Sequence, residues 1–214
     1  MSISHKIRQT ILAAVAAFGL VAFNAPAIAA DHPAQKMVET AIVELRDVLE
    51  NDLDKIKADP AYLKSRVDEI IVPNVDFNTM TKLAVGKFWK RANRNQKTEL
   101  VTEFQTLLMK TYAGALTEYN GETMRFEPFR PEKRDDRAVV RSIFSPTRGS
   151  DVPVTYKLRD KNGWSIYDIE VDNISLVTSY RSAFSNEIEK GGVSGLLNTL
   201  KQRCLLYTSP SPRD

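Results

Sequence analysis

The stretch from Gly163 to Phe184 reads GWSIYDIEVDNISLVTSYRSAF, and its pattern changes halfway along. Its first half alternates without leaving either face wholly polar, which is typical of a strand covered on part of both sides. The alternation puts three residues on one face: Trp164, Ile166 and Asp168. Asp172-Asn173 predicts a turn, and Ser175 stands at an N-cap position. Apolar residues then recur at helical spacing at Leu176, Val177, Tyr180 and Phe184. The stretch therefore predicts a strand that leads directly into an amphipathic helix.

Toward the N-terminus, helical spacing of apolar residues predicts further helices. The first covers residues 34–54, and a second begins at Pro60 and ends near Pro73. A short helix follows, capped by Asp76 and ended by Gly86. A capping-box-like start at residues 93–96 then opens a long helix that ends at Asn120-Gly121.

After Gly121 the apolar period changes to two. This period predicts strands over residues 123–129, 137–144, 152–158 and 163–171. The connections between them are short and contain polar residues, Gly or Pro, which favours an antiparallel meander. The predicted fold class is therefore α+β, with amphipathic helices packed on one face of a curved four-stranded antiparallel sheet.

Four blocks of sequence occur in a fixed order along the chain. They are Val75-Asp76-Phe77-x-x-Met80 with Gly86-x-x-Trp89, the long helix with Phe104, Leu107-Leu108, Thr111-Tyr112, Leu116 and Tyr119, the stretch 164–184, and Gly191 or Gly192 with Leu196-Leu197. Together they resemble the periplasmic phospholipid-binding family that includes MlaC and the toluene-tolerance (Ttg2-type) proteins, over residues 34–202. The chain departs from that family at Asp172-Asn173, where a Gly is usual in the turn. The resemblance implies that the helices and the sheet enclose an apolar cavity.

The two ends of the chain are expected to lie outside the folded domain. Residues 1–30 carry Lys6 and Arg8, an apolar run from 11 to 23 and small residues after it, which predicts a secretory signal peptide cleaved after Ala29 or Ala30. The alternative is an uncleaved membrane anchor. Residues 204–214, CLLYTSPSPRD, match the in-frame translation of a sequencing-library adapter, so we interpret them as an artefact and expect them to be disordered. Residues 31–203 are then the lipid-binding α+β domain, and we expect it in the periplasm.

Composition argues against several classes of function. Residues 31–203 carry 27 basic and 26 acidic residues, so charge gives no argument for nucleic acid as a partner. His5 and His32 lie in or next to the signal, and Cys204 lies in the presumed artefact. A fixed Ser-His-Asp or Cys-His site and a His-ligated metal are therefore not expected, nor is any cofactor.

Carboxylates leave one enzymatic alternative open. Asp76, Asp168, Glu170 and Asp172 are the residues available for a carboxylate pair. We interpret Asp76 instead as a helix cap and Asp168 as a strand carboxylate paired with an Arg.

The candidate lipid-binding residues come from the resemblance, because the residues alone equally describe an ordinary core. The resemblance implies that acyl chains contact Phe77, Met80, Trp89, Phe104, Leu108, Tyr112, Val154, Tyr156, Trp164, Ile166, Tyr180 and Phe184. Basic side chains are expected at the rim, for the lipid headgroup or for partner proteins: Lys90, Arg91, Arg94 and Arg181.

The resemblance implies a monomeric periplasmic carrier of phospholipid rather than an enzyme. Its partners would be an inner-membrane ABC transporter complex and an outer-membrane lipoprotein complex, and its role would be to maintain outer-membrane lipid asymmetry. Two alternatives remain: an enzyme on an NTF2-like cone-shaped scaffold, and a periplasmic adaptor that binds no lipid and has a solid core.

Overall fold

The computed structural model describes residues 32–206, without the side chains of 60, 113–115 and 204–206. The predicted signal peptide and residues 207–214 lie outside this range. Residues 204–206 continue the last helix, whereas disorder was expected from residue 204 onward. Within the described range, no helix is both long enough and apolar enough to cross a membrane.

Three helices form the N-terminal part where two were predicted. They are α2 (Pro33–Asn51), α3 (Leu53–Ala58) and α4 (Pro60–Ile70). The predicted first helix breaks at Asp52, whose φ of −120° and ψ of 18° are not helical. The Asp52 carboxylate accepts hydrogen bonds from Lys55 (2.5 Å) and from the Tyr62 hydroxyl (2.7 Å), which ties α3 and α4 to this corner.

The next helices follow the predicted caps. Helix α5 (Phe77–Val85) begins at Asp76, whose carboxylate accepts from the Thr79 amide at 2.8 Å, and ends at Gly86 with φ of 61°. A 3-10 helix η2 (Gly86–Arg91) leads to α6 (Arg94–Thr117). Asn93 and Gln96 exchange two side-chain to backbone hydrogen bonds of 3.0 and 2.9 Å, which is the predicted capping box.

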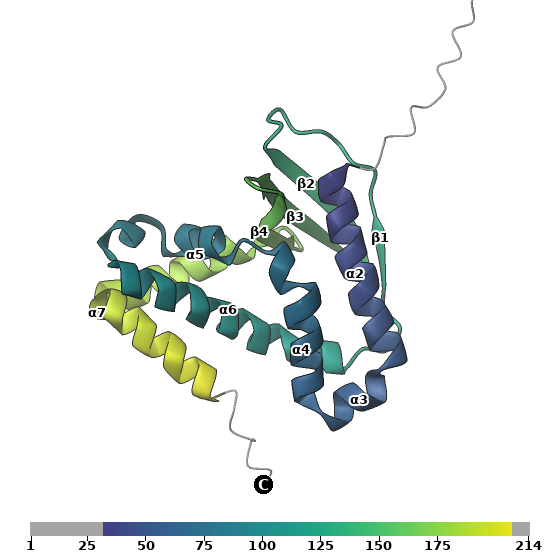
Figure 1. Cartoon of the computed structure of the whole chain (residues 1–214), viewed down its shortest axis with the longest axis horizontal. Coiled ribbons are helices and arrows are strands. Elements are labelled where there is room, and N and C mark those ends of the chain that lie inside the picture. Colours follow the sequence, from purple (N-terminus) through teal and green to yellow (C-terminus); the bar gives the residue numbers. More distant parts are fainter. Residues whose placement is uncertain (1–31, 207–214) are drawn as a thin grey trace, which may run out of the picture. The chain divides into compact units, whose positions relative to one another are not determined.

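Helix α7 (Leu176–Leu206) consists of two arms joined at Gly192. Gly192 has φ of 66° and ψ of −169°, a conformation that is essentially restricted to glycine. The second arm folds back along the first, as Figure 1 shows in yellow-green and yellow, and the Thr199 hydroxyl donates to Glu187 at 3.0 Å.

The sheet has the four predicted strands and a short fifth one. The strands are β1 (Thr123–Phe126), β2 (Arg137–Ser145), β3 (Val152–Asp160), β4 (Trp164–Val171) and β5 (Ile174–Ser175), all antiparallel and in chain order. Asp172 and Asn173 link β4 to β5 with φ of 51° and 62°. Asn and Asp tolerate this left-handed conformation better than other non-glycine residues, so the turn forms without the family's usual Gly.

A bulge in β4 changes which residues share a face. Leu158 pairs with Ile166 but its neighbour Lys157 pairs with Asp168, so Tyr167 is the extra residue. Ile166 and Asp168 therefore lie on opposite faces, and the prediction that they share one was wrong. We call the face that carries Leu158 and Ile166 the inner face.

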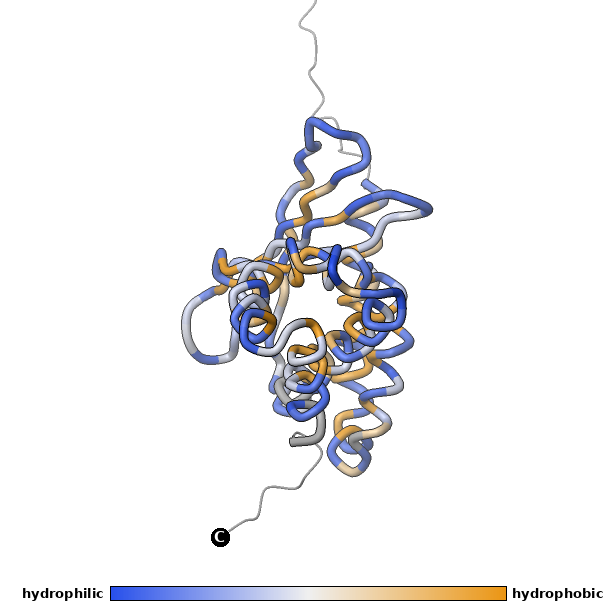
Figure 2. The backbone as a smooth tube through the Cα atoms, turned by 90° about the vertical axis from the view of Figure 1, so that its left-hand side faces the viewer, coloured by the Kyte–Doolittle hydropathy of each residue, from blue (hydrophilic) through white to orange (hydrophobic). Residues whose placement is uncertain are grey.

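Helices contact both faces of the sheet, whereas the sequence predicted one. Helix α2 packs on the inner face, where Ala34 and Val38 join a cluster with strand residues. On the opposite face, the start of α7 covers Asp168, which is 5% exposed. Figure 2 shows hydrophobic and hydrophilic residues interleaved along the strands, and hydrophilic loops beyond them.

Candidate functional site: a divided apolar interior

The buried apolar residues form three clusters rather than one. The helical cluster joins α5, η2, α6 and α7. The sheet cluster joins the inner face and α2. The third cluster lies among α2, α3 and α4. The buried residues therefore contact one another mainly within these three groups, and partly buried residues link the groups.

The twelve candidate lipid-binding residues are split between two of these clusters. The helical cluster contains Phe77, Met80, Phe104, Leu108 and Phe184 as buried members, with Trp89 and Tyr180 partly buried against it. The sheet cluster contains Val154, Tyr156 and Ile166 as buried members, with Trp164 partly buried. The Phe104 ring meets the rings of Tyr180 and Phe184 edge-on, at centroid distances of 4.9 and 5.1 Å.

Tyr112 is separate from the other eleven candidates. Its side chain is 46% exposed, which makes it one of the large exposed apolar residues of the described chain. It belongs to neither of the clusters above. Helical spacing puts Tyr112 four residues after Leu108, but burial ends between the two.

Two residues outside the candidate lipid-binding set link the clusters. Val75 packs against both the helical and the sheet cluster, and it forms an isolated parallel bridge with Ile166. Met109 packs against both the helical cluster and the third cluster. Both are only partly buried. The sequence signal for Val75 was its place in the first family block, beside the Asp76 cap, and the signal for Met109 was its place on the long helix.

The inner face also carries two buried hydroxyl groups. Ser142 is 1% exposed and donates to the Val154 carbonyl at 3.4 Å. The Tyr156 hydroxyl donates to the Met124 sulfur at 3.4 Å. Burial raises the pKa of Tyr156 to about 12, so this phenol stays neutral at physiological pH.

The carboxylates considered for catalysis have structural partners. Asp168 accepts hydrogen bonds from the Ser175 hydroxyl (2.8 Å) and the Val177 amide (3.2 Å) at the start of α7. Its ion-pair partner is Lys157 at 3.6 Å, so the predicted pairing with an Arg was wrong. The bulge at Tyr167 explains this, because it brings Asp168 opposite Lys157.

Asp76 is a helix cap, as predicted, and it also carries a charge network. Arg159 lies 3.9 Å and Lys161 3.4 Å from its carboxylate. Burial raises the pKa of Asp76, but hydrogen bonds from the Thr79 hydroxyl and amide and the charge of Lys161 outweigh this effect, so the pKa lies below its usual value. Asp76 is therefore ionised at neutral pH, where it stabilises the start of α5.

His32 is fixed in the folded domain, contrary to the expectation that no His would be. Its Nδ1 accepts from the Ala34 amide at 3.2 Å and caps α2. Its ring stacks on Phe129 with a centroid distance of 4.0 Å and meets Trp164 edge-on at 5.1 Å. Among the described residues there is no group of three His, Cys, Asp or Glu side chains that could hold a metal ion.

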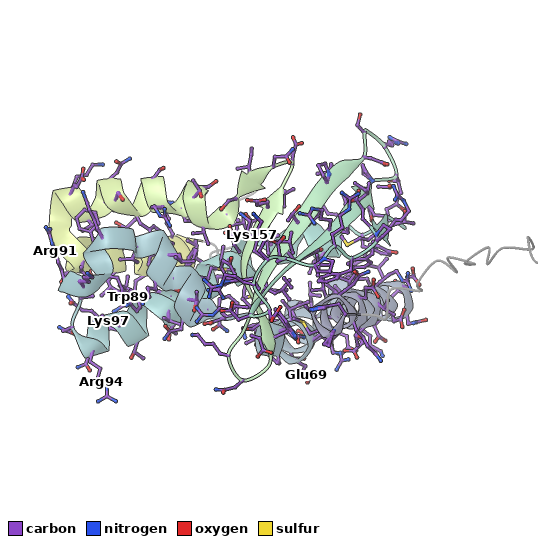
Figure 3. All side chains as sticks on the ribbon, turned by 90° about the horizontal axis from the view of Figure 1, so that it is seen from above. Glu69, Trp89, Arg91, Arg94, Lys97 and Lys157 are labelled. Atoms are coloured by element: carbon purple, nitrogen blue, oxygen red, sulfur yellow. The ribbon has the colours of Figure 1, made fainter. Side chains whose placement is uncertain are left out.

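The predicted rim residues are exposed, and most lie around η2. Lys90 and Arg91 are on η2, and Arg94 begins α6. Arg181 of α7 lies beside Gly86 at the start of η2, and its Nε donates to the Leu83 carbonyl of α5 at 2.9 Å. Figure 3 shows Arg91 and Arg94 near Trp89 and Lys97, away from Lys157 on the sheet.

Comparison with known proteins gives consistent relatives over most of the chain. The family described as "MlaC protein" matches residues 39–202. The toluene tolerance protein ttg2D of Pseudomonas putida is 27% identical over 190 residues, covering 87% of this chain and 84% of that protein. The intermembrane phospholipid transport system binding protein MlaC of Haemophilus influenzae is 25% identical over 191 residues, covering 86% and 89%.

A solved structure is similar in fold as well as in sequence. It is a phospholipid-binding protein from Ralstonia solanacearum, determined in complex with a phospholipid. The two structures superpose with a TM-score of 0.77 at 33% sequence identity, over 83% of this chain and all of that one.

Proposed function

We propose, from the premise that this chain belongs to the MlaC family, that it binds phospholipid and carries it through the periplasm between membranes. The observation that supports this most strongly is the relative from Ralstonia solanacearum, which shares the fold and was solved with a phospholipid bound. The apolar character of the candidate residues adds physical support, because acyl chains need apolar side chains to contact.

The acyl chains would insert where the three clusters adjoin. Val75 and Met109 each contact two clusters while remaining partly exposed, so they mark the places where apolar surface stays accessible. Burying an acyl chain is favourable by about 0.8 kcal/mol per CH₂ group, so roughly fifteen carbons contribute about 12 kcal/mol. Apolar burial alone is then sufficient to hold a lipid.

The polar headgroup would remain outside, near the basic rim. No covalent step is required, because transfer exchanges one apolar surface for another. The carrier would receive lipid from an outer-membrane lipoprotein complex and deliver it to an inner-membrane ABC transporter, whose ATPase would supply the energy. This exchange would maintain the lipid asymmetry of the outer membrane.

The test is mass spectrometry of an organic extract of the protein purified from the periplasm. We expect about one phospholipid equivalent or more per protein, recovered after washing. The adaptor and the enzyme alternatives predict a protein that carries no stoichiometric lipid. An extract without phospholipid, from a protein shown to be folded by circular dichroism, would refute the carrier.

The same extract tests how the lipid is recognised. Apolar side chains dominate the candidate site and candidate phosphate ligands are few, so we expect the headgroup to vary more than the number of chains. Recovery of one headgroup with lipids of every chain number would contradict this prediction.

A further inference from the structure

One segment concentrates positive charge without acidic residues. Residues 82–97 read KLAVGKFWKRANRNQK and contain six cationic side chains and no Asp or Glu. We call these six the basic patch: Lys82, Lys87, Lys90, Arg91, Arg94 and Lys97. Within the described part of the chain, none of the six is in an ion pair. Their charge is therefore not neutralised within the protein.

The local fold keeps these side chains on the surface. Phe88 is 4% exposed and anchors η2 in the helical cluster. Lys87 and Arg91 both lie over its ring, with 4.9 Å from Nζ and 5.3 Å from Cζ to the centroid. Such contacts hold a cation beside an aromatic ring without neutralising it. Arg181 of α7 adds a further cation against Gly86.

A hollow of about 330 Å³ opens beside the basic patch, and two residues of the patch, Arg94 and Lys97, line it. Its lining includes Trp89, Arg94, Lys97, Asn78, Thr98 and Thr102. Lys97 Nζ lies 5.8 Å from the centroid of the Trp89 ring, and Figure 3 shows Trp89, Arg94 and Lys97 grouped together. Cations, hydroxyl groups and one half-buried indole ring in a hollow suit a phosphate-bearing headgroup.

The rest of the domain has the opposite net charge. Outside the basic patch, residues 31–203 carry 21 basic and 26 acidic residues. The basic patch is thus positive and the rest of the domain is net negative. An anionic surface would therefore attract the basic patch and orient the domain with this patch facing the surface.

We propose that the basic patch docks the protein on the surface of a bilayer that contains anionic phospholipid. The inference rests on the proposed carrier function, which requires contact with membranes. It goes further, because carrying lipid does not by itself identify which surface of the protein contacts the membrane. Four of the six cations are Lys, a residue depleted in protein interfaces, whereas polybasic segments bind anionic lipid surfaces. Trp89 is also typical of the interface between membrane and water. The large exposed apolar residues, Val43, Tyr112, Val171 and Ile174, all lie outside the patch, so docking is superficial and depends on salt.

The test is co-sedimentation of the purified full chain with vesicles. Wild type should bind vesicles of phosphatidylcholine mixed with phosphatidylglycerol, should bind pure phosphatidylcholine vesicles weakly, and should be released by added salt. The triple variant Lys82→Gln/Lys87→Gln/Lys97→Gln should bind the anionic vesicles about 100-fold more weakly. The matched control is Lys36→Gln/Lys57→Gln/Lys133→Gln, which removes the same charge from exposed lysines elsewhere and should bind nearly as wild type does.

Three results would overturn the proposal. The first is equal loss of binding in both triple variants, which would indicate net charge alone. The second is equal binding of wild type to both kinds of vesicle. The third is no binding of wild type to anionic vesicles, which would favour an acidic protein as the partner of the patch. If the triple variant fails to fold, the double variant Lys82→Gln/Lys87→Gln, which leaves the predicted rim residues intact, gives the same reading with an expected loss of about tenfold or more.

Lipid extraction from the same samples separates this proposal from the proposed function. The patch variant should retain its phospholipid, because Lys82, Lys87 and Lys97 lie outside the apolar interior. If wild type contains phospholipid but does not bind anionic vesicles, docking is refuted and carriage is not. If wild type binds anionic vesicles but contains no phospholipid, carriage is refuted and docking is not.

Discussion

Asp76 shows how one side chain serves a helix and a sheet together. It caps α5 through Thr79 and lies near Arg159 and Lys161 of the neighbouring hairpin. Removing the cap by Asp76→Ala should lower the free energy of unfolding by about 1–2 kcal/mol at neutral pH. Asp76→Asn, which can still cap but carries no charge, should cost less. Urea unfolding of the three proteins measures both effects, and equal costs for Ala and Asn would show that the charge, not the cap, dominates.

Asp76 also predicts a dependence of stability on pH. Its pKa in the folded state is lowered, so its contribution is present above the unfolded-state value of about 3.9 and is lost as pH falls through the folded-state pKa. Wild type should therefore lose more stability between neutral pH and strongly acidic pH than Asp76→Asn does. Parallel urea midpoints along that pH series provide the measurement, and identical acid sensitivity would contradict the shift.

Leu108 tests whether a candidate site residue contacts lipid. It is 7% exposed in the helical cluster, one position before Met109. If acyl chains reach it, Leu108→Trp can fill the space they leave, so the variant should fold, lose lipid and show little change in Tm when stripped. Stripping should lower the Tm of wild type, because bound lipid stabilises only the native state. The control is Leu200→Trp in the same cluster, 1% exposed, where overpacking should cost about 1–3 kcal/mol. Equal unfolding of both variants would contradict lipid contact at Leu108.

At the scale of elements, the bend in α7 at Gly192 can be tested by substitution, and the neighbouring Gly191 provides the control. Neither Gly191 nor Gly192 has an atom within 4 Å of an added Cβ, so packing does not distinguish them. Backbone conformation does, because only Gly192 has a positive φ. Gly192→Ala should destabilise the protein by about 1–3 kcal/mol, while Gly191→Ala should be neutral or stabilising by about 0.5–1 kcal/mol. Thermal unfolding compares the two, and similar values would mean that the arms do not require this bend.

Signals between residues close in sequence predicted most helices and strands. The features that were not predicted depend on contacts between residues distant in sequence. The caps at Asp76 and Asn93 were visible because their partners lie three residues away. The bulge at Tyr167 was not visible, because a bulge is defined by the register of a neighbouring strand. The pairing of Asp168 with Lys157 was missed for the same reason. The break at Asp52 depends on Tyr62, ten residues away, so periodicity alone continued the first helix through it.

The sequence predicted which residues belong to the candidate site, but not how these residues are arranged in space. Hydrophobicity and the family resemblance identified side chains that are mostly buried, such as Phe104 and Tyr156. They did not indicate that the set divides into two clusters, or that Val75 and Met109 join the clusters. Which apolar residues face a ligand and which face each other depends on how helices pack across the sheet, and no single periodicity contains that information.

At the scale of the whole molecule, the folded domain begins immediately after the predicted cleavage site. His32 caps α2 and stacks on Phe129, so the N-cap lies two residues beyond Ala30 and the helix begins three residues beyond it. Export should produce a mature N-terminus at Ala30 or Asp31. N-terminal sequencing of periplasmic protein measures this directly, and an intact Met1 would favour the membrane-anchor alternative.

The helical cluster also determines when the chain can finish folding. It joins residues of α5 and α6 to residues of α7 that follow the whole sheet in sequence, and Gln96 with Ser194 and Glu99 with Lys201 bridge the same gap. Until α7 has been synthesised, Leu100 and Phe104 lack the α7 residues that complete their cluster. Contacts so far apart in sequence form slowly. The predicted export across a membrane would benefit from such a delay, because the last segment to emerge is the one that closes the core.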